Sequence, residues 1–346
     1  MVSAAEGLAE NLLKITHWSP LLVRRSLIRF CATWIGGALL SSAAFAQTFP
    51  SKMLNVVVPY PAGGPSDFVA RLIQPEYQKQ LGQQLIIENI GGVAGALGVQ
   101  KVLTAPADGY TQVMATPMEL VLAPLALAAV KFKPEDMRLA GMIANTSMLL
   151  LVPAHSPAKS IDEFLALAKG KELTVGNVGV GSLYHLIAEK FALQAGVKFI
   201  HVPYKGAAPL MTDVAGGTVD AAFFPLAGPV PGMVREGKVR ALGIAASKPH
   251  PQFPSVPTIS SHKGFPGFNF DIWIGVQVPK GTPDGVVDRI NAAMNAVLQN
   301  TDVRKGIEGT GSVLADPQRR ADLDKLYAFE IDRYRAMAKG INLSPQ

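Results

Sequence analysis

The sequence NVVVPYPAGGPSDFVAR, residues 55–71, contains a strand, a glycine loop and the start of a helix in close succession. The three valines predict a strand buried on both faces, and the prolines and glycines that follow predict its end in a loop. Ser66 or Asp67 is placed to cap a helix, which is expected to end at Gly82. Unpaired N–H groups and the helix dipole at such a start favour an anion, although a tight turn that needs glycine is the alternative interpretation.

The same pattern recurs later in the chain. Alternating strands and helices over residues 55–115 predict right-handed βαβ units and a parallel sheet. A second strand, glycine loop and helix follow at residues 173–195. The first loop matches neither a Walker loop nor GxGxxG, so no nucleotide is implied. Two loops on separate α/β units predict one ligand held between two lobes, beyond the carboxyl ends of the strands.

Other segments have clear secondary-structure signals. Pro75 lies inside the first helix and is expected to kink it or end it early. Residues 142–152 predict a long apolar strand, and Ser160 to Glu163 form a capping box at the start of another helix. Two helices, residues 284–298 and 318–338, are expected to complete the chain.

An export signal is predicted at the amino terminus. Arg24, Arg25 and Arg29 flank a short apolar segment, and Ala44-Phe45-Ala46 is an A-x-A cleavage site before Gln47. A membrane anchor would need about 20 apolar residues, which this segment does not supply. The arginine pair leaves export by the twin-arginine route open beside the general route.

The composition limits the kinds of site and partner that the protein can have. The chain has 346 residues, of which 49% are hydrophobic, and this is long enough for two domains. Its only cysteine, Cys31, lies in the predicted signal, so the mature chain has no disulfide, thiolate catalysis or cysteine–metal site. The net charge of +6 becomes +6 − 2 = +4 once the four basic and two acidic residues of 1–46 are removed. This mild charge without Lys/Arg runs excludes nucleic acid as a partner, and it fits an anionic small ligand or an ordinary solvated surface. The histidines lack metal-ligand spacing, so no metal is expected.

Several side chains have both a structural and a functional interpretation. Ser66 and Ser182 are helix N-caps or hydroxyl donors to a bound carboxylate. Ser182 and His185 form a nucleophile–base pair, a ligand contact or an ordinary helix face, but no G-x-S-x-G sequence surrounds Ser182 and no acid is evident to orient the histidine. Tyr204 and Lys205 either contact the ligand or are solvated. Asp67 and Asp220 are expected to be structural.

Several strings in order closely resemble the Bug family of periplasmic solute receptors, the binding partners of tripartite tricarboxylate transporters. The resemblance covers residues 56–334 and rests on PYPAGGPSDFVAR at 59–71, LGQQLIIEN at 81–89, ADGYT at 107–111, the glycine loop with Ser182 and His185, HVPYKGAAPLMTDVAGGTVDAAF at 201–223 and VPTISSHKGFPGF at 256–268. It implies an α/β, two-lobed, type II periplasmic-binding-protein fold in which each lobe is a mostly parallel sheet flanked by helices. The implied division is a signal peptide at 1–46, lobe 1 at 47–150 and 275–346, and lobe 2 at 151–274.

The resemblance also implies a function and a site. It implies a monomeric periplasmic protein without enzymatic activity, cofactor or metal, which captures a small organic carboxylate for membrane transporter subunits. A receptor that reports to a membrane sensor kinase and a periplasmic enzyme acting on carboxylates are the alternatives. The ligand residues carried over are Tyr60, Ala62, Gly63, Gly64, Ser66, Asp67, Thr116, Asn177, Gly179, Gly181, Ser182, His185, Tyr204, Lys205 and Asp220.

The chain departs from the family pattern at Met118 and Glu119. A carboxylate added beside the cleft is expected to disfavour a dicarboxylate unless Glu119 faces away. A dicarboxylate, an amino acid, an aromatic acid and a neutral amide therefore all stay open as ligands.

Overall fold

The computed structural model describes residues 49–179 and 181–340. The predicted signal peptide lies outside them, so only the unit that begins at Phe49 is described. Within these residues, no helix combines the length and apolar character that crossing a bilayer requires.

Strands and helices alternate along most of the chain, as the sequence pattern predicts. The strands are β1 (Leu54–Val58), β2 (Leu85–Asn89), β3 (Thr111–Ala115), β4 (Met137–Pro153), β5 (Leu173–Asn177), β6 (Phe199–Pro203), β7 (Ala221–Pro225), β8 (Val239–Ala245), β9 (Asp271–Pro279) and β10 (Val313–Leu314). The α-helices are α3 (Pro65–Leu81), α4 (Ala96–Thr104), α5 (Ala123–Ala126), α6 (Ile161–Gly170), α7 (Leu183–Ala195), α8 (Ala207–Gly216), α9 (Val230–Arg235), α10 (Asp284–Val297), α11 (Thr301–Gly309) and α12 (Arg320–Gly340). Short helical turns are η2 (Val93–Gly95), η3 (Met118–Leu122), η4 (Pro134–Asp136) and η5 (Ile259–Ser261).

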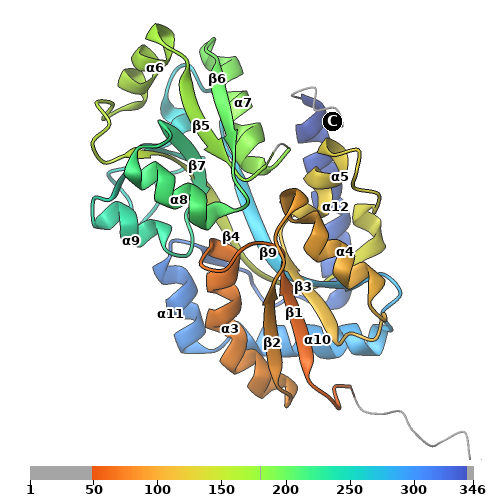
Figure 1. Ribbon diagram of the computed structural model, residues 1–346. Coiled ribbons are helices and arrows are strands. Elements are labelled where there is room, and N and C mark those ends of the chain that lie inside the picture. Colours follow the sequence, from red (N-terminus) through yellow and green to blue (C-terminus); the bar gives the residue numbers. More distant parts are fainter. Residues whose placement is uncertain (1–48, 180, 341–346) are drawn as a thin grey trace, which may run out of the picture. The chain divides into compact units, whose positions relative to one another are not determined.

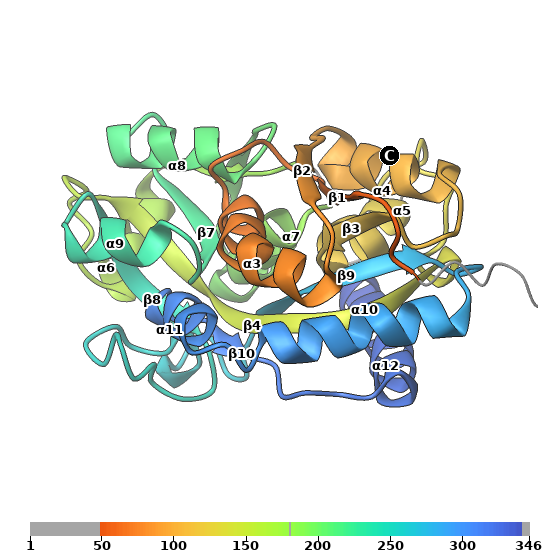
Figure 2. The ribbon, with the colours of Figure 1, turned by 90° about the horizontal axis from the view of Figure 1, so that it is seen from below.

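Two groups of parallel strands are joined by antiparallel ones. β1 pairs in parallel with β2 and β3, and β5 pairs in parallel with β6 and β7. β9 and β4 lie between these groups, in the order β2-β1-β3-β9-β4-β7-β5-β6. Residues 137–147 of β4 pair with β9, whereas residues 148–153 pair with β7 and β8. β4 thus spans the region between the two groups, and Figure 2 shows it running from the side of α6 and α9 to the side of α10.

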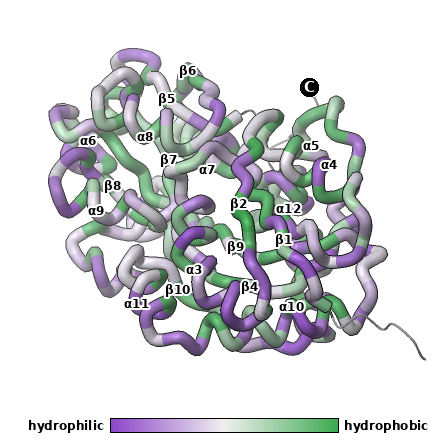
Figure 3. Tube along the Cα trace, turned by 60° about the horizontal axis from the view of Figure 1, so that its bottom comes forward, coloured by the Kyte–Doolittle hydropathy of each residue, from purple (hydrophilic) through white to green (hydrophobic). Residues whose placement is uncertain are grey.

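Helices cover both groups of strands (Figure 1). Helices α6, α7, α8 and α9 accompany β5 to β7, and α3, α4 and α10 accompany β1 to β3. Hydrophobic residues follow the inner strands, whereas hydrophilic residues recur along outer helices such as α6 and α11 (Figure 3). Val56, Val57 and Val58 are at most 1% exposed, which confirms the buried strand that the three valines predict. The fold class is α/β, as predicted.

Three local expectations need correction. Helix α3 begins at Pro65 with Gly64 as its N-cap, so neither Ser66 nor Asp67 caps it. Proline suits the first helical position, where no N–H is needed, so the helix begins two residues earlier than a Ser66 cap would place it. Pro75 does not end α3, which continues to Leu81 and ends at Gly82 as predicted. Helix α11 has no counterpart among the predicted helices, because its apolar residues are few and most of its other residues are polar.

Candidate ligand-binding site

A cavity lies between elements of the two strand groups, with about 600 Å³ of atom-free space that includes open solvent. Its lining residues are Tyr60, Gly64, Pro65, Ser66, Val69, Thr116, Met118, Ala144, Asn145, Thr146, Val178, Tyr184, Ala207, Pro225, Ala227, Ile272, Trp273, Ile274 and Ser312.

The first turns of three helices border the cavity. Pro65 and Ser66 are the first two residues of α3, Ala207 opens α8, and Tyr184 is the second residue of α7. The N–H groups of a helix's first turn lack intrahelical partners and carry the positive end of the dipole. Three helix N-termini at one cavity favour an anionic group there.

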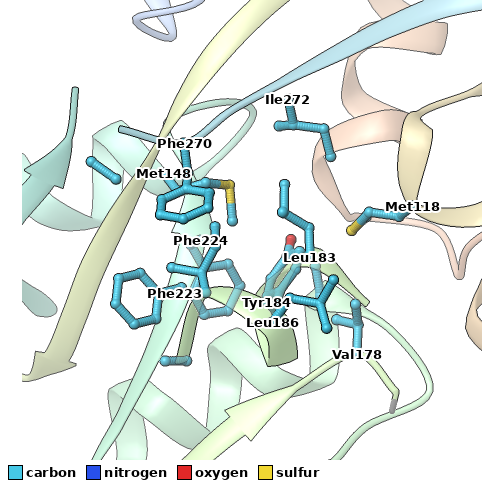
Figure 4. Packing of buried hydrophobic residues seen from close by; sticks show 14 of the residues in the cluster. Met118, Met148, Val178, Leu183, Tyr184, Leu186, Phe223, Phe224, Phe270 and Ile272 are labelled. Carbon is cyan, nitrogen blue, oxygen red and sulfur yellow. The ribbon is translucent and has the colours of Figure 1, made fainter. Parts of the chain in front are cut away.

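The cavity wall is mostly apolar, and none of the described residues that line it is charged. Figure 4 shows the Tyr184 ring beside Phe224, with Met118 and Ile272 on other elements of the same region. The two rings meet edge to face, with centroids 5.4 Å apart. The Tyr184 hydroxyl makes no hydrogen bond to another described residue, so its O–H is available to a ligand.

Two polar side chains that line the cavity, those of Asn145 on β4 and Trp273 on β9, are held by hydrogen bonds to acidic residues outside the lining. Trp273 Nε1 donates to Glu330 at 3.0 Å, and Asn145 Nδ2 donates to Asp271 at 2.6 Å. Arg333 pairs with both of these carboxylates. The indole N–H of Trp273 already donates to Glu330, so Trp273 offers mainly apolar surface to the cavity.

A buried carboxyl lies behind two of the predicted site residues. Glu119 is fully buried in the π-helical turn η3. Its carboxyl accepts hydrogen bonds from Thr116 N at 2.5 Å, Thr116 Oγ1 at 2.8 Å and Tyr60 Oη at 3.2 Å. Burial raises the pKa of Glu119 to about 7, although these hydrogen bonds act in the opposite direction. Burial, together with the nearby Glu119, also raises the pKa of Tyr60.

The close contact between Glu119 and Tyr60 depends on a glycine. Gly95 has φ +87°, and a Cβ there would lie 2.8 Å from Glu119 Cβ and 3.2 Å from Tyr60 Oη. Any larger residue would combine backbone strain with a clash against both side chains. The glycine-rich turn that precedes α4 therefore allows this hydrogen-bond group to form.

Asp67 fixes the first glycine loop from within. Its carboxylate accepts hydrogen bonds from Gly63 N at 2.9 Å, Arg71 Nε at 2.9 Å and Asn89 Nδ2 at 3.0 Å. Burial raises the pKa of Asp67, but the bonds from Arg71, Gly63 and Asn89 outweigh it and hold that pKa below its ordinary value. Ala62 and Gly63 are exposed on the same loop and lie outside the cavity lining.

The second glycine loop is closely packed. Gly181 has φ +80°, and a Cβ there would lie 1.9 Å from Ala126 Cβ. Gly179 donates its N–H to Asn177 Oδ1 at 2.9 Å. The buried Asn177 Nδ2 has no hydrogen-bond partner among the described residues. Ser182 caps α7 by accepting from His185 N at 3.4 Å, which confirms its predicted capping role.

His185 lies beside a second histidine and an acid. One potential ligand atom from each of His185, Glu189 and His201 lies within 4.8 Å of the others. However, His185 Nδ1 accepts a hydrogen bond from Gly181 N at 3.2 Å, so Nε2 of the neutral ring carries the hydrogen and offers no lone pair. Burial, with the neighbouring His201, lowers the pKa of His185 to about 4. A metal would require the other tautomer, and the absence of a metal site stays a prediction.

Tyr204, Lys205 and Asp220 also lie outside the cavity lining. Tyr204 Oη donates to Asp213 at 2.7 Å, and burial and this carboxylate raise the pKa of Tyr204 to about 12. Lys205 is exposed. Asp220 accepts hydrogen bonds from the N–H and hydroxyl of Thr174, both at 2.8 Å.

The structure thus brings four predicted residues to the cavity: Tyr60, Gly64, Ser66 and Thr116. The residues that sequence reasoning missed come mainly from the middle of β4 and the start of β9, and Tyr184 from α7. Tyr184 had a usable signal, because it lies two residues after the predicted cap Ser182. No contact with a ligand is recorded for any predicted residue, so the predicted set remains a proposal.

The chain is similar to known periplasmic proteins. The structure titled "periplasmic binding protein BugD" has a TM-score of 0.81 and 27% identity, covering 86% of this chain and 100% of that chain. MatC from Rhodopseudomonas palustris, with bound malate, has a TM-score of 0.78 and 33% identity, covering 84% and 99%. Rpa4515 of R. palustris, with adipate, has a TM-score of 0.81 and 30% identity, covering 86% and 100%.

These likenesses define a two-lobed periplasmic solute-binding protein. Residues 69–343 match the family described as "TctC: Tripartite tricarboxylate transporter family receptor". The chain belongs to this TctC/Bug family, as its resemblance to the Bug receptors predicts. The family is one of solute receptors rather than of enzymes.

Proposed function

We propose that the protein captures a small organic carboxylate in the cavity and delivers it to the membrane subunits of a tripartite tricarboxylate transporter. The description of its family supports the transporter partner. The malate and adipate in the two R. palustris structures support a small carboxylate as ligand. The proposal includes no chemical conversion of the ligand, no cofactor, and a monomer that acts in the periplasm.

One observation carries the proposal: three helix N-termini border a cavity that has no charged side chain on its wall. Backbone N–H groups and hydroxyls can hold a carboxylate without burying an unpaired cation, which would be costly in the empty site. The geometry also disfavours the Ser182–His185 nucleophile. Ser182 Oγ accepts from the backbone N–H of His185, and the imidazole instead accepts from Gly181.

The lobe boundaries belong to this proposal too. The predicted crossovers near residues 150 and 274 fall on β4 and β9, the two antiparallel strands that lie between the strand groups. We expect lobe closure on the ligand to bend the chain there.

The proposal is tested by calorimetric titration with malate, adipate and an aromatic acid, using wild type and a matched pair of serine variants. Ser66→Ala removes a hydroxyl from the cavity wall and is expected to weaken carboxylate binding about tenfold. Ser182→Ala removes a buried cap, and is expected to cost about 1 kcal/mol of unfolding free energy with little effect on binding.

Equal binding by Ser66→Ala and wild type would contradict the proposed position of the carboxylate. A tenfold loss in Ser182→Ala at unchanged stability would instead support the Ser182 contact that the family resemblance implies. If no acid binds wild type, the carboxylate ligand itself is wrong.

A further inference from the structure

Glu119 is a buried acid that the proposed capture of a carboxylate does not use, although it touches two cavity residues. We propose that Glu119 is a positioning residue that decides whether Tyr60 and Thr116 offer hydrogens or lone pairs to the ligand, so that an anionic ligand binds together with one proton at this carboxyl. This inference rests on the proposed function, because it assumes that the cavity holds the ligand.

In the ionised state, neither Thr116 nor Tyr60 has a hydroxyl hydrogen left for the ligand. A carboxylate only accepts hydrogen bonds. Thr116 Oγ1 therefore donates its hydrogen to ionised Glu119 at 2.8 Å, and Tyr60 Oη donates either to Glu119 at 3.2 Å or to the carbonyl oxygen of Ala94 at 3.3 Å. Thr116 Oγ1 also accepts from Met118 N at 3.2 Å. In this state both hydroxyls present only lone pairs to the cavity, which repel a ligand carboxylate.

Protonation of Glu119 reverses this arrangement at one of the two hydroxyls. The acid hydrogen can be donated to Thr116 Oγ1 or to Tyr60 Oη, while Thr116 N at 2.5 Å still donates to the other carboxyl oxygen. When Thr116 Oγ1 is the acceptor, it can turn its own hydrogen toward the cavity, whereas the hydrogen of Tyr60 Oη has the carbonyl oxygen of Ala94 as an alternative acceptor. The proton comes from solvent, and the bound ligand keeps its negative charge. One new donor therefore meets the anion, and like-charge repulsion between two carboxylates is removed.

Among the described residues, Glu119 makes no ion pair with a cation. Burial, together with the charge of Glu119, raises the pKa of four nearby tyrosines, Tyr60, Tyr184, Tyr327 and Tyr334. Two cations of the neighbouring helices are paired with other acids: Lys101 of α4 pairs with Glu88, and Arg333 of α12 pairs with Asp271 and Glu330. Burial therefore favours the neutral acid, in the same direction as an anionic ligand.

The opposite ligand chemistry predicts the opposite pH dependence. A ligand that presents a hydroxyl, amide or ammonium hydrogen to Tyr60 and Thr116 would favour the ionised acid and bind more tightly as the pH rises. Whether Kd rises or falls with pH thus distinguishes an anionic ligand bound with neutral Glu119 from a hydrogen-donating ligand bound with ionised Glu119.

The experiment measures Kd for malate and adipate by calorimetry between pH 6 and 9, where ordinary carboxylates are already ionised. For wild type, Kd is expected to rise with pH and to approach a tenfold increase per pH unit as Glu119 ionises, with uptake of one proton seen as a buffer-dependent heat. Glu119→Gln imitates the neutral acid, because its amide oxygen accepts from Thr116 N and its NH₂ donates to a hydroxyl. Its Kd is expected to be independent of pH and close to the wild-type value at pH 6.

Glu330→Gln is the matched control, because Glu330 is also buried but is paired with Arg333 and contacts the cavity residue Trp273. The Kd of Glu330→Gln should change with pH as the wild-type Kd does, even if its absolute value differs. A wild-type Kd that does not change with pH, a Kd that falls with pH, or a pH dependence that persists in Glu119→Gln would each overturn the inference while leaving carboxylate capture intact. If wild type binds neither acid even at pH 6, the proposed function for these ligands fails, and the inference fails with it.

Discussion

Glu119 makes the stability of the ligand-free protein depend on pH. Its ordinary pKa of 4.5 is raised to about 7 by burial. Below pH 4.5 the acid is neutral in both states, whereas between the two values the unfolded chain releases a proton that the folded protein keeps. Folding stability therefore falls as the pH rises through this range, by roughly 3 kcal/mol in total. The Glu119→Gln variant has no ionisable group at this position, so it should not lose this stability as the pH rises.

Urea unfolding at pH 5 and pH 8 measures this effect. Between pH 5 and pH 8, we expect wild type to lose roughly 2.5 kcal/mol more of its unfolding free energy than Glu119→Gln does. The difference needs no ligand, so it tests the titration of Glu119 independently of binding. If the unfolding free energies of wild type and Glu119→Gln differ by the same amount at pH 5 and pH 8, Glu119 does not titrate between these pH values.

Single residues of the site were only partly predictable. Tyr60, Ser66 and Thr116 were found because they lie in or directly after strand–loop segments, where parallel strands place their ends together. Glu119 was noticed only as a departure from the family pattern, and its burial against Tyr60 was not foreseeable. Trp273 and Asn145 were missed because their strands have no local sequence signal for a ligand, and only tertiary pairing brings them to the cavity.

At the scale of elements, the second glycine loop makes a specific prediction. Gly181→Ala would force a left-handed backbone on alanine and place its Cβ 1.9 Å from Ala126 Cβ. Strain and overpacking together are expected to cost about 2–5 kcal/mol of unfolding free energy. Gly196→Ala is the control, because Gly196 has φ +66° with no heavy atom near its Cβ position, and should cost about 1 kcal/mol.

Urea titration of both variants at one pH gives the comparison. Similar losses in the two variants would contradict the close packing of the loop against α5. A larger loss in Gly181→Ala would show that this contact, and not the backbone conformation alone, requires glycine.

Most elements follow from local patterns. The run of valines, the caps at Ser160 and Ser182 and the stops at Gly82 and Gly196 each place a boundary that the structure reproduces within a few residues. The start of α3 was misplaced because Pro65 competes with the two polar residues after it. Helix α11 begins with an Asn300 cap, but it was missed because it has too few apolar residues to show a helical period.

For the whole molecule, the antiparallel strands β4 and β9 explain why distant parts of the sequence meet. They run between the two groups of parallel strands and bring Asn145 and Trp273 to the same cavity as the first turn of α3. No single segment of sequence contains this site. Sequence reasoning could place the two loops on separate units, but the order of strands between them depends on tertiary pairing.

The central claim, that the cavity holds a small organic carboxylate, is tested most directly by identifying the ligand that the protein carries. The protein would be purified from the periplasm without added ligand and denatured, and the released small molecules would be identified by mass spectrometry. The account predicts an intact organic acid in near-equal molar amount with the protein. Release of a neutral or cationic compound in that amount would contradict it.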